Sequence, residues 1–381
     1  MNDFTVYFLT PPPGRQTLCC HFGRQGIGLE ETGETFPSDS FFAALVAQAA
    51  TLDDAALDAD GVPELARAFC AGEPPLLHSS LFPRLGDLPL LPRPALPLNV
   101  TDDTLRAWIG KGFKRLKYLS PALFTAACAG LPITSAPLIL QGGKVWMTEA
   151  EARTLTDDPW RRRANESDEA WKRRLAATPI WLAVGEPHVT VDRVSCASAY
   201  YEVGRVTFAP GAGLALLVRF IDPAWRPRFE GLLDLLAHSG LGGRRTGGSG
   251  AFAWRLGRAL DAMPGAVGTR AVLLSRYLPA KDEIAALRSA EAAYQLVVVG
   301  GWLFSPGQIP QRRQRVRMVA EGSVLDVRAA ALRGLVLDVR PDYSQSMRAH
   351  PVLGRDVGTP HPVYRSGLAL TTPIPDWKEA S

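Results

Sequence analysis

The pattern of apolar and polar positions divides the first part of the chain into strands and helices. Residues 4–10 are β-branched or aromatic and partly alternate, which predicts a strand, and a second extended piece is expected from Cys19 to Leu29. A helix is predicted next. Ser38 suits its N-cap, Asp39 suits the positive helix end, and the apolar residues between 41 and 49 share one face. Residues 213–220 have the pattern of a buried strand.

A second helix has the clearest pattern in the chain. Asp222-Pro223 opens it, since proline fits the first helical position and aspartate can cap it. Apolar residues then recur at i, i+4, i+7, i+8 and i+11 and make one core-facing stripe: Trp225, Phe229, Leu232, Leu233 and Leu236. Ser239-Gly240 ends the helix, a Gly-rich loop follows, and a strand restarts at 251–254.

The remainder of the chain repeats this plan. Strands are predicted at 270–278, 293–304, 314–320, 334–339 and 362–370, and a short helix at 280–292. The doubled strand–helix–strand–strand–helix–strand order predicts an α+β fold of two tandem ferredoxin-like (RRM-type) domains, residues 1–260 and 261–381. The first domain is expected to hold the Gly-rich loop and a large insertion at about 83–195, including a projecting basic hairpin region. Five prolines between 83 and 97 are too many for a helix or a central strand.

Composition narrows the class of protein. With 381 residues and 46% apolar content, the chain can bury a sizeable core, in two domains. No signal-peptide layout and no apolar run near the roughly 20 residues of a membrane helix are present, so we expect a soluble cytoplasmic protein without membrane contact. Five irregularly spaced cysteines fit reduced, buried thiols better than a metal site, and no cofactor is expected.

Charge is distributed unevenly. Residues 241–370 carry 18 Lys+Arg against 9 Asp+Glu, and 17 of those basic residues are arginine. The other residues carry 24 Lys+Arg against 29 Asp+Glu. A basic half beside a mildly acidic one indicates a polyanion partner on one side and a protein partner on the other.

The loop from Gly240 to Gly250 is the first candidate site, with six glycines in eleven positions and Arg244-Arg245 at its centre. Glycines leave backbone N–H groups bare, so the loop could cradle phosphates while the arginines neutralise them. It is not a P-loop, because no lysine follows Gly248 and a helix precedes it. A flexible hairpin connection is the alternative interpretation.

Four further segments have open interpretations. The run from Trp160 to Arg174 is predicted to be helical, and we favour a solvated helix with a packed tryptophan face over an RNA-facing one. Alternating arginines at 313, 315 and 317 would share one strand face and meet either RNA or an acidic neighbour. Residues 51–75, rich in Asp and Glu, could be solvated helices or a docking face for a basic partner, and reversing Asp53, Asp54 and Asp58 would test the latter. The adjacent carboxylate pairs read as turn or helix-start signals.

Several of these segments resemble the RAMP superfamily in its order along the chain. Gly26 to Thr32 reads G-I-G-L-E-E-T and Ser38 to Leu45 reads S-D-S-F-F-A-A-L. Phe82 to Pro94 and Lys114 to Ser120 are similar to the family's proline-rich and lysine-rich insertion. Val191-Asp192-Arg193, the Gly-rich loop, and Val363 to Gly367 complete the match, although Thr246-Gly247-Gly248 replaces a common double serine. The chain thus resembles the subunit of type III-A (Csm) CRISPR effector complexes that binds the crRNA 5′ handle.

The resemblance implies a non-catalytic, crRNA-binding structural subunit in antiviral defence. Its partners would be the crRNA, the large palm-domain CRISPR subunit, a neighbouring RAMP backbone subunit and, through the complex, target RNA, into whose duplex a β-hairpin is pushed. The RNA contacts carried over are Gly242, Gly243, Arg244, Arg245, Ser249, Gly250, Ser38 and Arg365, with Arg93, Lys114, Arg115 and Lys117 of the insertion as weaker candidates. The alternative is a metal-independent RAMP endoribonuclease that processes precursor crRNA. It would need a base such as His21 beside a second His or Lys, and no such pair is found.

Overall fold

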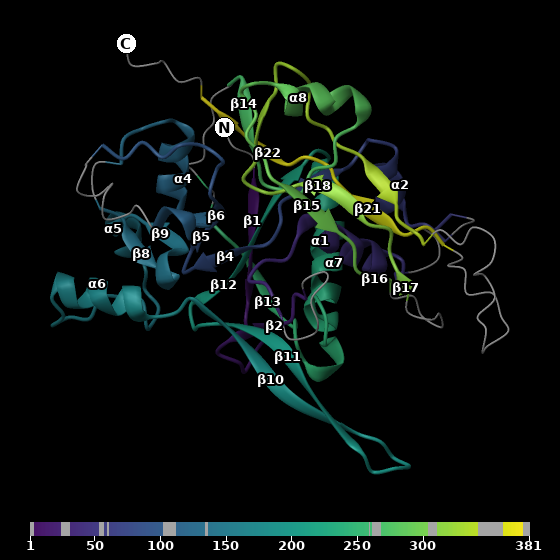
Figure 1. The fold of residues 1–381 in the computed structure, drawn as a ribbon, viewed down its shortest axis with the longest axis horizontal. Coiled ribbons are helices and arrows are strands. Elements are labelled where there is room, and N and C mark those ends of the chain that lie inside the picture. The colour runs from purple at the N-terminus through teal and green to yellow at the C-terminus, as the bar shows by residue number, and fades with distance from the viewer. Residues whose placement is uncertain are drawn as a thin grey trace.

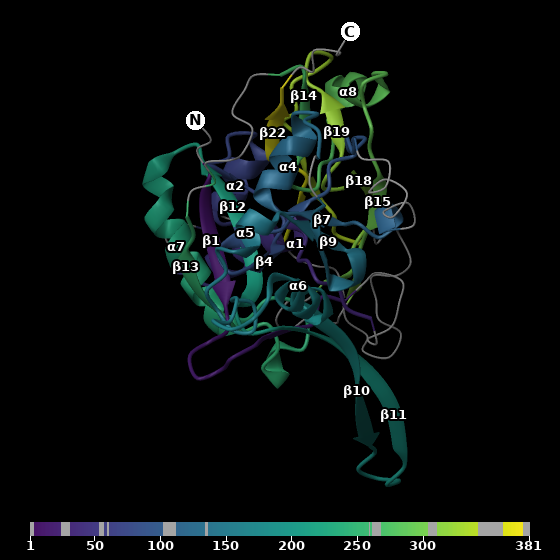
Figure 2. The same cartoon turned by 90° about the vertical axis from the view of Figure 1, so that its left-hand side faces the viewer.

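The structure is a computed structural model that describes residues 4–23, 31–52, 57–58, 61–101, 112–133, 136–258, 260, 268–303, 311–341 and 361–375. Figures 1 and 2 show a body of mixed sheets and helices from which one long hairpin projects. Among these described residues, no helix is both long and apolar enough to cross a bilayer. The predicted α+β class is confirmed, with several separate sheets.

The main sheet has the strand order β13-β1-β12-β4-β5, and every neighbouring pair is antiparallel. Its strands are β1 (Thr5–Thr10), β4 (Phe82–Leu85), β5 (Leu88–Pro89), β12 (Ala212–Phe220) and β13 (Ala253–Leu256), and β3 (Leu76–His78) also pairs with β12. Helix α1 (Ser38–Ala49) follows β1, and α7 (Arg226–Ser239) joins β12 to β13. The elements β1, α1, β4, β12, α7 and β13 therefore follow the strand–helix–strand–strand–helix–strand plan predicted for a ferredoxin-like domain. Pro83 lies in β4, inside this sheet, which its proline-rich surroundings did not predict.

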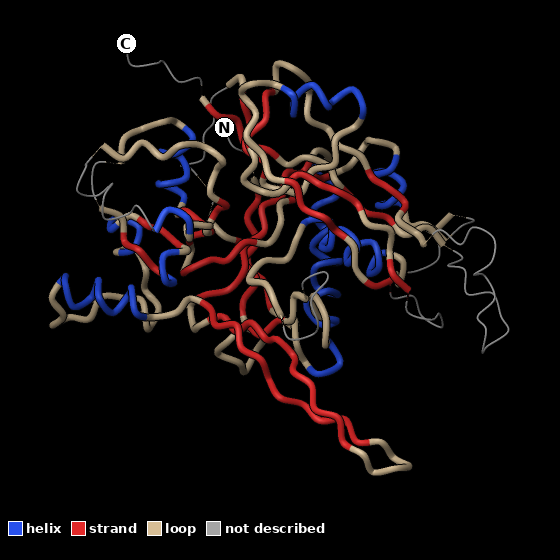
Figure 3. The backbone as a smooth tube through the Cα atoms, viewed as in Figure 1, coloured by secondary structure: helices blue, strands red, loops and turns tan. Residues whose placement is uncertain are grey.

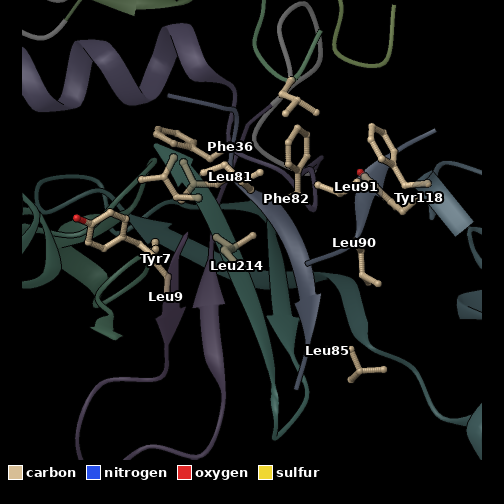
Figure 4. Close-up of a cluster of buried hydrophobic side chains, with 14 of the residues drawn as sticks. Tyr7, Leu9, Phe36, Leu81, Phe82, Leu85, Leu90, Leu91, Tyr118 and Leu214 are labelled. Atoms are coloured by element: carbon tan, nitrogen blue, oxygen red, sulfur yellow. The ribbon is translucent and has the colours of Figure 1, made fainter. Parts of the chain in front are cut away.

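Both predicted helices bury the faces that their periodicity indicated. In α1 the buried apolar side chains are Phe41, Phe42, Leu45 and Ala49, and in α7 they are Phe229, Leu232, Leu233, Leu236 and Ala237. These side chains join one large core with β1 and β12, part of which Figure 4 shows around Tyr7, Leu214 and Phe82. Asp222 caps the short 3-10 turn Pro223–Trp225 ahead of α7, as predicted, and Gly240 ends α7 with φ of 79°. The N-cap of α1 is Pro37 and not Ser38, which lies one residue inside the helix.

The insertion has a sheet of its own beside the main sheet. Its sheet has the order β6-β7-β9-β8, formed by Leu91–Pro92, Tyr118–Leu119, Val145–Met147 and Leu138–Leu140. Helices α4 (Pro121–Cys128), α5 (Glu149–Ala152) and α6 (Asp168–Ala177) and the 3-10 turns Gly112–Lys114 and Gln141–Gly143 complete it, while α2 (Glu64–Cys70) precedes β3.

The run from Trp160 to Arg174 is helical only from Asp168 onward. Trp160 and Trp171 are both fully buried, and the indole N–H of Trp171 donates to the carbonyl of Trp160 at 3.1 Å. Arg162 and Arg174 form ion pairs with Asp168 and Glu166. The packed tryptophan face is therefore confirmed, the helix is shorter than predicted, and the choice between solvent and RNA for the arginines of this run stays a prediction.

The projecting hairpin consists of β10 (Trp181–Val191) and β11 (Ser198–Phe208), paired in register over their whole length. Figure 3 shows both strands running from the body to the tip. The root of β11 pairs with β2 (Leu18–Cys20), so the hairpin continues a sheet of the body. Residue 195, where the insertion was expected to end, lies in the hairpin turn. These strands are not basic, because residues 181–208 contain two arginines and three carboxylates.

The second half is divided among small sheets in its described residues. β19 (Val324–Asp326), β14 (Arg270–Leu273) and β22 (Thr371–Ile374) form one of them. The others pair β15 (Leu296–Val299) with β18 (Val316–Val319), β16 (Trp302–Leu303) with β17 (Gln311–Arg312), and β20 (Val336–Asp338) with β21 (Tyr364–Ser366). The 3-10 turn Lys281–Glu283 and α8 (Ile284–Arg288) are the described helical turns. The strand predicted over 293–304 is interrupted at Gly301, whose φ is +123°.

The prediction that the alternating arginines at 313, 315 and 317 lie on one strand is wrong. Residues 313–315 lie between β17 and β18, so the three arginines do not share a strand face. Burial lowers the pKa of Arg313 to about 10, whereas Arg315 and Arg317 are exposed.

Candidate nucleic-acid interface

The Gly-rich loop is held against β2 by backbone hydrogen bonds. The N–H of Gly243 donates to the carbonyl of His21 at 2.9 Å, and the N–H of Gly250 donates to the carbonyl of Cys19 at 2.7 Å. Gly242 has φ of +85°, and a Cβ on it would lie 2.4 Å from the His21 carbonyl oxygen. A glycine is therefore required at position 242 by the close approach of the loop to His21, which follows β2, so this loop is not a loose connection.

These bonds contradict the expectation that bare backbone N–H groups of the loop would bind an anion. The N–H groups of Gly247 and Gly248 donate to the carbonyls of Arg244 and Arg245, so together with Gly243 and Gly250 four loop amides are already used. Ser249 is also buried, with 6% of its surface exposed. Bare amides are thus not available at these positions, and the cationic side chains are what the loop presents to solvent.

Arg244 and Arg245 are both exposed at the outer turn of the loop. Arg244 adopts a left-handed conformation with φ of 56° and begins the 3-10 turn Arg245–Gly247. Among the residues that the structure describes, neither guanidinium forms an ion pair with a carboxylate. The guanidinium of Arg244 lies over the ring of Tyr201 in β11, 5.4 Å from its centroid. The predicted basic centre of the loop is therefore open to solvent and adjoins strand β11 of the hairpin at Tyr201.

His21 supports the loop from below. It is 5% exposed, and its Nδ1 lies 2.6 Å from the carbonyl oxygen of Gly204 in β11. Gly243 covers it so closely that a Cβ there would lie 2.7 Å from the imidazole Cδ2. A buried, hydrogen-bonded imidazole of this kind ties β2, β11 and the loop together.

Ser38 and Arg365 lie elsewhere, in a buried joint between the two halves of the chain. Ser38 is 4% exposed, and its Oγ accepts from the backbone N–H of Arg276 at 2.9 Å. Arg365 is 2% exposed and forms an ion pair with Asp39, which also pairs with Arg276 at 3.0 Å. Burial lowers the pKa of Arg365, and the carboxylate of Asp39 opposes that shift. Because their polar groups point into this joint, Ser38 and Arg365 do not form a surface with the Gly-rich loop, which corrects the grouping inferred from the sequence.

Two of the four insertion candidates line a cavity of about 590 Å³. Arg93 and Lys117 line this cavity together with Tyr118, Gln295 and Glu321. Lys117 forms an ion pair with Glu34 at 2.8 Å. Burial alone would raise the pKa of Glu34, but its hydrogen bonds with Lys117 and Tyr118 outweigh burial, so the pKa of Glu34 lies below its usual value. Arg93 donates to the carbonyl of Phe113, and Lys114 and Arg115 are exposed. These residues form a second group, around the insertion's sheet.

Two of the sequence segments lie partly or wholly outside the described residues. These are 24–30, which carries most of the G-I-G-L-E-E-T segment, and Asp53, Asp54 and Asp60 of the acidic stretch. Within the acidic stretch, Asp58 pairs with Arg67 and Glu64 pairs with Arg228.

The chain is similar in sequence and in fold to known proteins. Residues 267–374 match the family described as the CRISPR Csm4 C-terminal domain. The resemblance to a type III-A RAMP subunit, drawn above from sequence motifs, is thereby confirmed. The CRISPR system Cms protein Csm4 of Thermococcus onnurineus (strain NA1) is 28% identical over 149 residues, which are 38% of this chain and 45% of that protein. The match thus spans less than half of that relative's length.

Two solved Csm4-containing assemblies share the fold along the whole chain. One is a Csm3-Csm4 subcomplex of the type III-A CRISPR-Cas interference complex, with a TM-score of 0.57, 14% identity, and coverage of 98% of this chain and 100% of the matched one. The other is a Csm1-Csm4 cassette in complex with pppApA, with a TM-score of 0.53, 17% identity and 99% coverage of both chains. At these identities the likeness shows a common fold.

The sequence indicated a projecting hairpin, but neither its strands nor the paired rings of His188 and Tyr201 were identified from it. The signal was present: residues 198–208 are rich in Val, Thr and Tyr, and a turn-forming Asp192 precedes them. In the structure the Asp192 carboxylate accepts from the N–H groups of Val194 and Ser195 and closes the turn.

Proposed function

We propose that this chain is a non-catalytic crRNA-binding subunit of a type III-A CRISPR effector complex, where it holds the 5′ handle of the guide. One observation carries the proposal: two exposed arginines without carboxylate partners in the described chain occupy a hydrogen-bonded Gly-rich loop that lies against a projecting hairpin. Phosphate contacts from such arginines fix the position of an RNA chain without reading its sequence.

The partners follow from the relatives. The matched assemblies join Csm4 to Csm3 and to Csm1. We assign this chain the corresponding partners, a RAMP backbone subunit and the large palm-domain subunit, with target RNA met through the complex in the cytoplasm. The hairpin is the element that would enter the guide–target duplex, because it projects from the body and exposes Val189, Val191, Val194 and Tyr200.

The domain plan belongs to the same proposal. We assign residues 1–260 and 261–381 to two ferredoxin-like domains. The strand order of the main sheet supports the first, and the family match to 267–374 supports an independent second unit. The endoribonuclease alternative is disfavoured because His21 is buried and bound to the Gly204 carbonyl, out of reach of a ribose 2′-OH.

The salt dependence of RNA binding tests the role of the loop. For a single-stranded RNA, the slope of log K against log salt should become shallower by about 1.4 in Arg244→Ala/Arg245→Ala, because roughly 0.7 is lost for each phosphate contact. The melting temperature should stay within a degree or two of wild type, since both side chains are exposed.

Arg161→Ala/Arg162→Ala is the matched control, because it removes two adjacent exposed arginines that pair with carboxylates in the insertion. It should leave the slope unchanged. An equal change of slope in both double variants would show that net charge, and not the loop, governs binding. A wild-type chain that fails to bind RNA, alone and with its partner subunits, would refute the proposal.

A further inference from the structure

Three side chains form a continuous stack where the Gly-rich loop meets the hairpin. His188 in β10 lies directly opposite Tyr201 in β11, and their rings are nearly parallel, at an angle of 20° with centroids 5.4 Å apart. The Arg244 guanidinium lies over the same Tyr201 ring, also at 5.4 Å. We refer to His188, Tyr201 and Arg244 as the stacking column.

The column is open to solvent and held on a rigid base. His188 and Arg244 are exposed, and Tyr201 is partly exposed. The base is fixed by the bond from His21 to Gly204, three residues along β11 from Tyr201, and by the bond from Gly243 to His21. A planar cation and two aromatic rings held in this way offer π-faces without requiring a conformational change.

We propose that the stacking column is a binding site for one unpaired RNA base, which extends the stack on the side of the hairpin. Stacking on tyrosine, histidine and arginine accepts any base, because every base has a π-face. The inference rests on the proposed RNA-binding function and adds to it a base contact, which the two loop arginines alone would not provide. It gives Arg244 a second role, since its guanidinium can contact a phosphate and at the same time form part of the stack.

The chain offers a matched pair for separating charge from stacking. Arg244 and Arg245 are adjacent and exposed. Of these two arginines, only Arg244 contacts an aromatic ring of the described residues. Lysine keeps the positive charge but lacks the planar guanidinium. Arg244→Lys should therefore impair stacking, whereas Arg245→Lys, which alters no ring contact, should leave stacking in place.

The test uses the full chain and an oligouridylate of about twelve nucleotides, within the range bound by single-strand proteins, in which one base is the fluorescent 2-aminopurine, placed in turn along the strand. Wild type should quench 2-aminopurine at one position. Tyr201→Leu should weaken binding roughly tenfold, as loss of one base stack does, and abolish the quenching while the salt slope stays unchanged. Tyr201→Phe should retain both affinity and quenching, because it keeps the ring.

Different outcomes separate this inference from the proposed function. If Tyr201→Leu and Arg244→Lys leave affinity and quenching intact while the salt slope still depends on the loop arginines, the column is not a base site and the RNA-binding function stands. If wild type binds no RNA, alone or in the co-purified complex, both fall. Circular dichroism melting checks that Tyr201→Leu is folded; if it is not, Arg244→Lys, which leaves the hairpin unaltered, decides.

Discussion

Replacing Asp39 by asparagine removes the carboxylate on which the joint between the two halves depends. Asp39 is 1% exposed in the first turn of α1, where it pairs with Arg365 and Arg276 from the second half. The ion pair of Arg365 with Asp39 is shielded from water, since Arg365 is 2% exposed. The buried Arg365 Nε has no hydrogen-bond partner among the described residues, so the guanidinium already lacks full compensation.

The expected cost follows from this burial. Removing one member of a buried ion pair strands the other charge and costs about 3–5 kcal/mol. The loss of unfolding free energy in Asp39→Asn should lie near the lower end of this range, because Arg276 can still pair with Glu321, 3.6 Å away. Removing both charges in Asp39→Asn/Arg365→Met should cost less than the sum of the single changes, since no buried charge is left unpaired.

Urea denaturation followed by tryptophan fluorescence measures these free energies of unfolding. Asp282→Asn is the control, because its ion pair with Arg333 is largely exposed and such pairs contribute about 0–1 kcal/mol. A loss below about 1 kcal/mol in Asp39→Asn, or strict additivity in the double variant, would refute the buried-joint argument. Arg365→Met that retains stability but loses RNA affinity would instead restore Arg365 as an RNA contact.

Two further predictions concern single buried positions. Burial lowers the pKa of His78 to about 4, against about 6.5 when unfolded, so the unfolded chain binds the extra proton first and stability falls as pH drops through this window. Between pH 8 and pH 5, wild type should lose about 2 kcal/mol more than His78→Leu in urea titrations; parallel pH profiles would contradict this. Gly250→Ala should cost at least about 2 kcal/mol, because φ is +80° and the new Cβ would lie 2.0 Å from the Leu241 carbonyl oxygen. Gly247→Ala, whose Cβ would meet no atom within 4 Å, should be nearly neutral in the same urea titrations.

The sequence was sufficient where structure depends on local periodicity. The apolar stripe of α7, its Asp222-Pro223 start and its Gly240 end were all predicted, as were β1, α1 and the α+β class. The basic centre of the Gly-rich loop was also predicted as exposed chemistry, because glycines and paired arginines are visible in the sequence itself. Each of these features is set by neighbours within a few turns of chain.

Tertiary structure decided which polar groups remain available. The amides of Gly243 and Gly250 are used by β2, more than 200 residues earlier in the chain, and Arg365 is neutralised by Asp39, 326 residues away. Similarly, Tyr201 gains its significance only because the loop brings Arg244 over its ring. Periodicity indicates whether a side chain is apolar and which face it shares, but burial and the choice of hydrogen-bond partner depend on segments distant in sequence. For that reason the loop could be found from the residues alone, whereas the division between its structural glycines, its solvent-facing arginines and the buried joint required the folded chain.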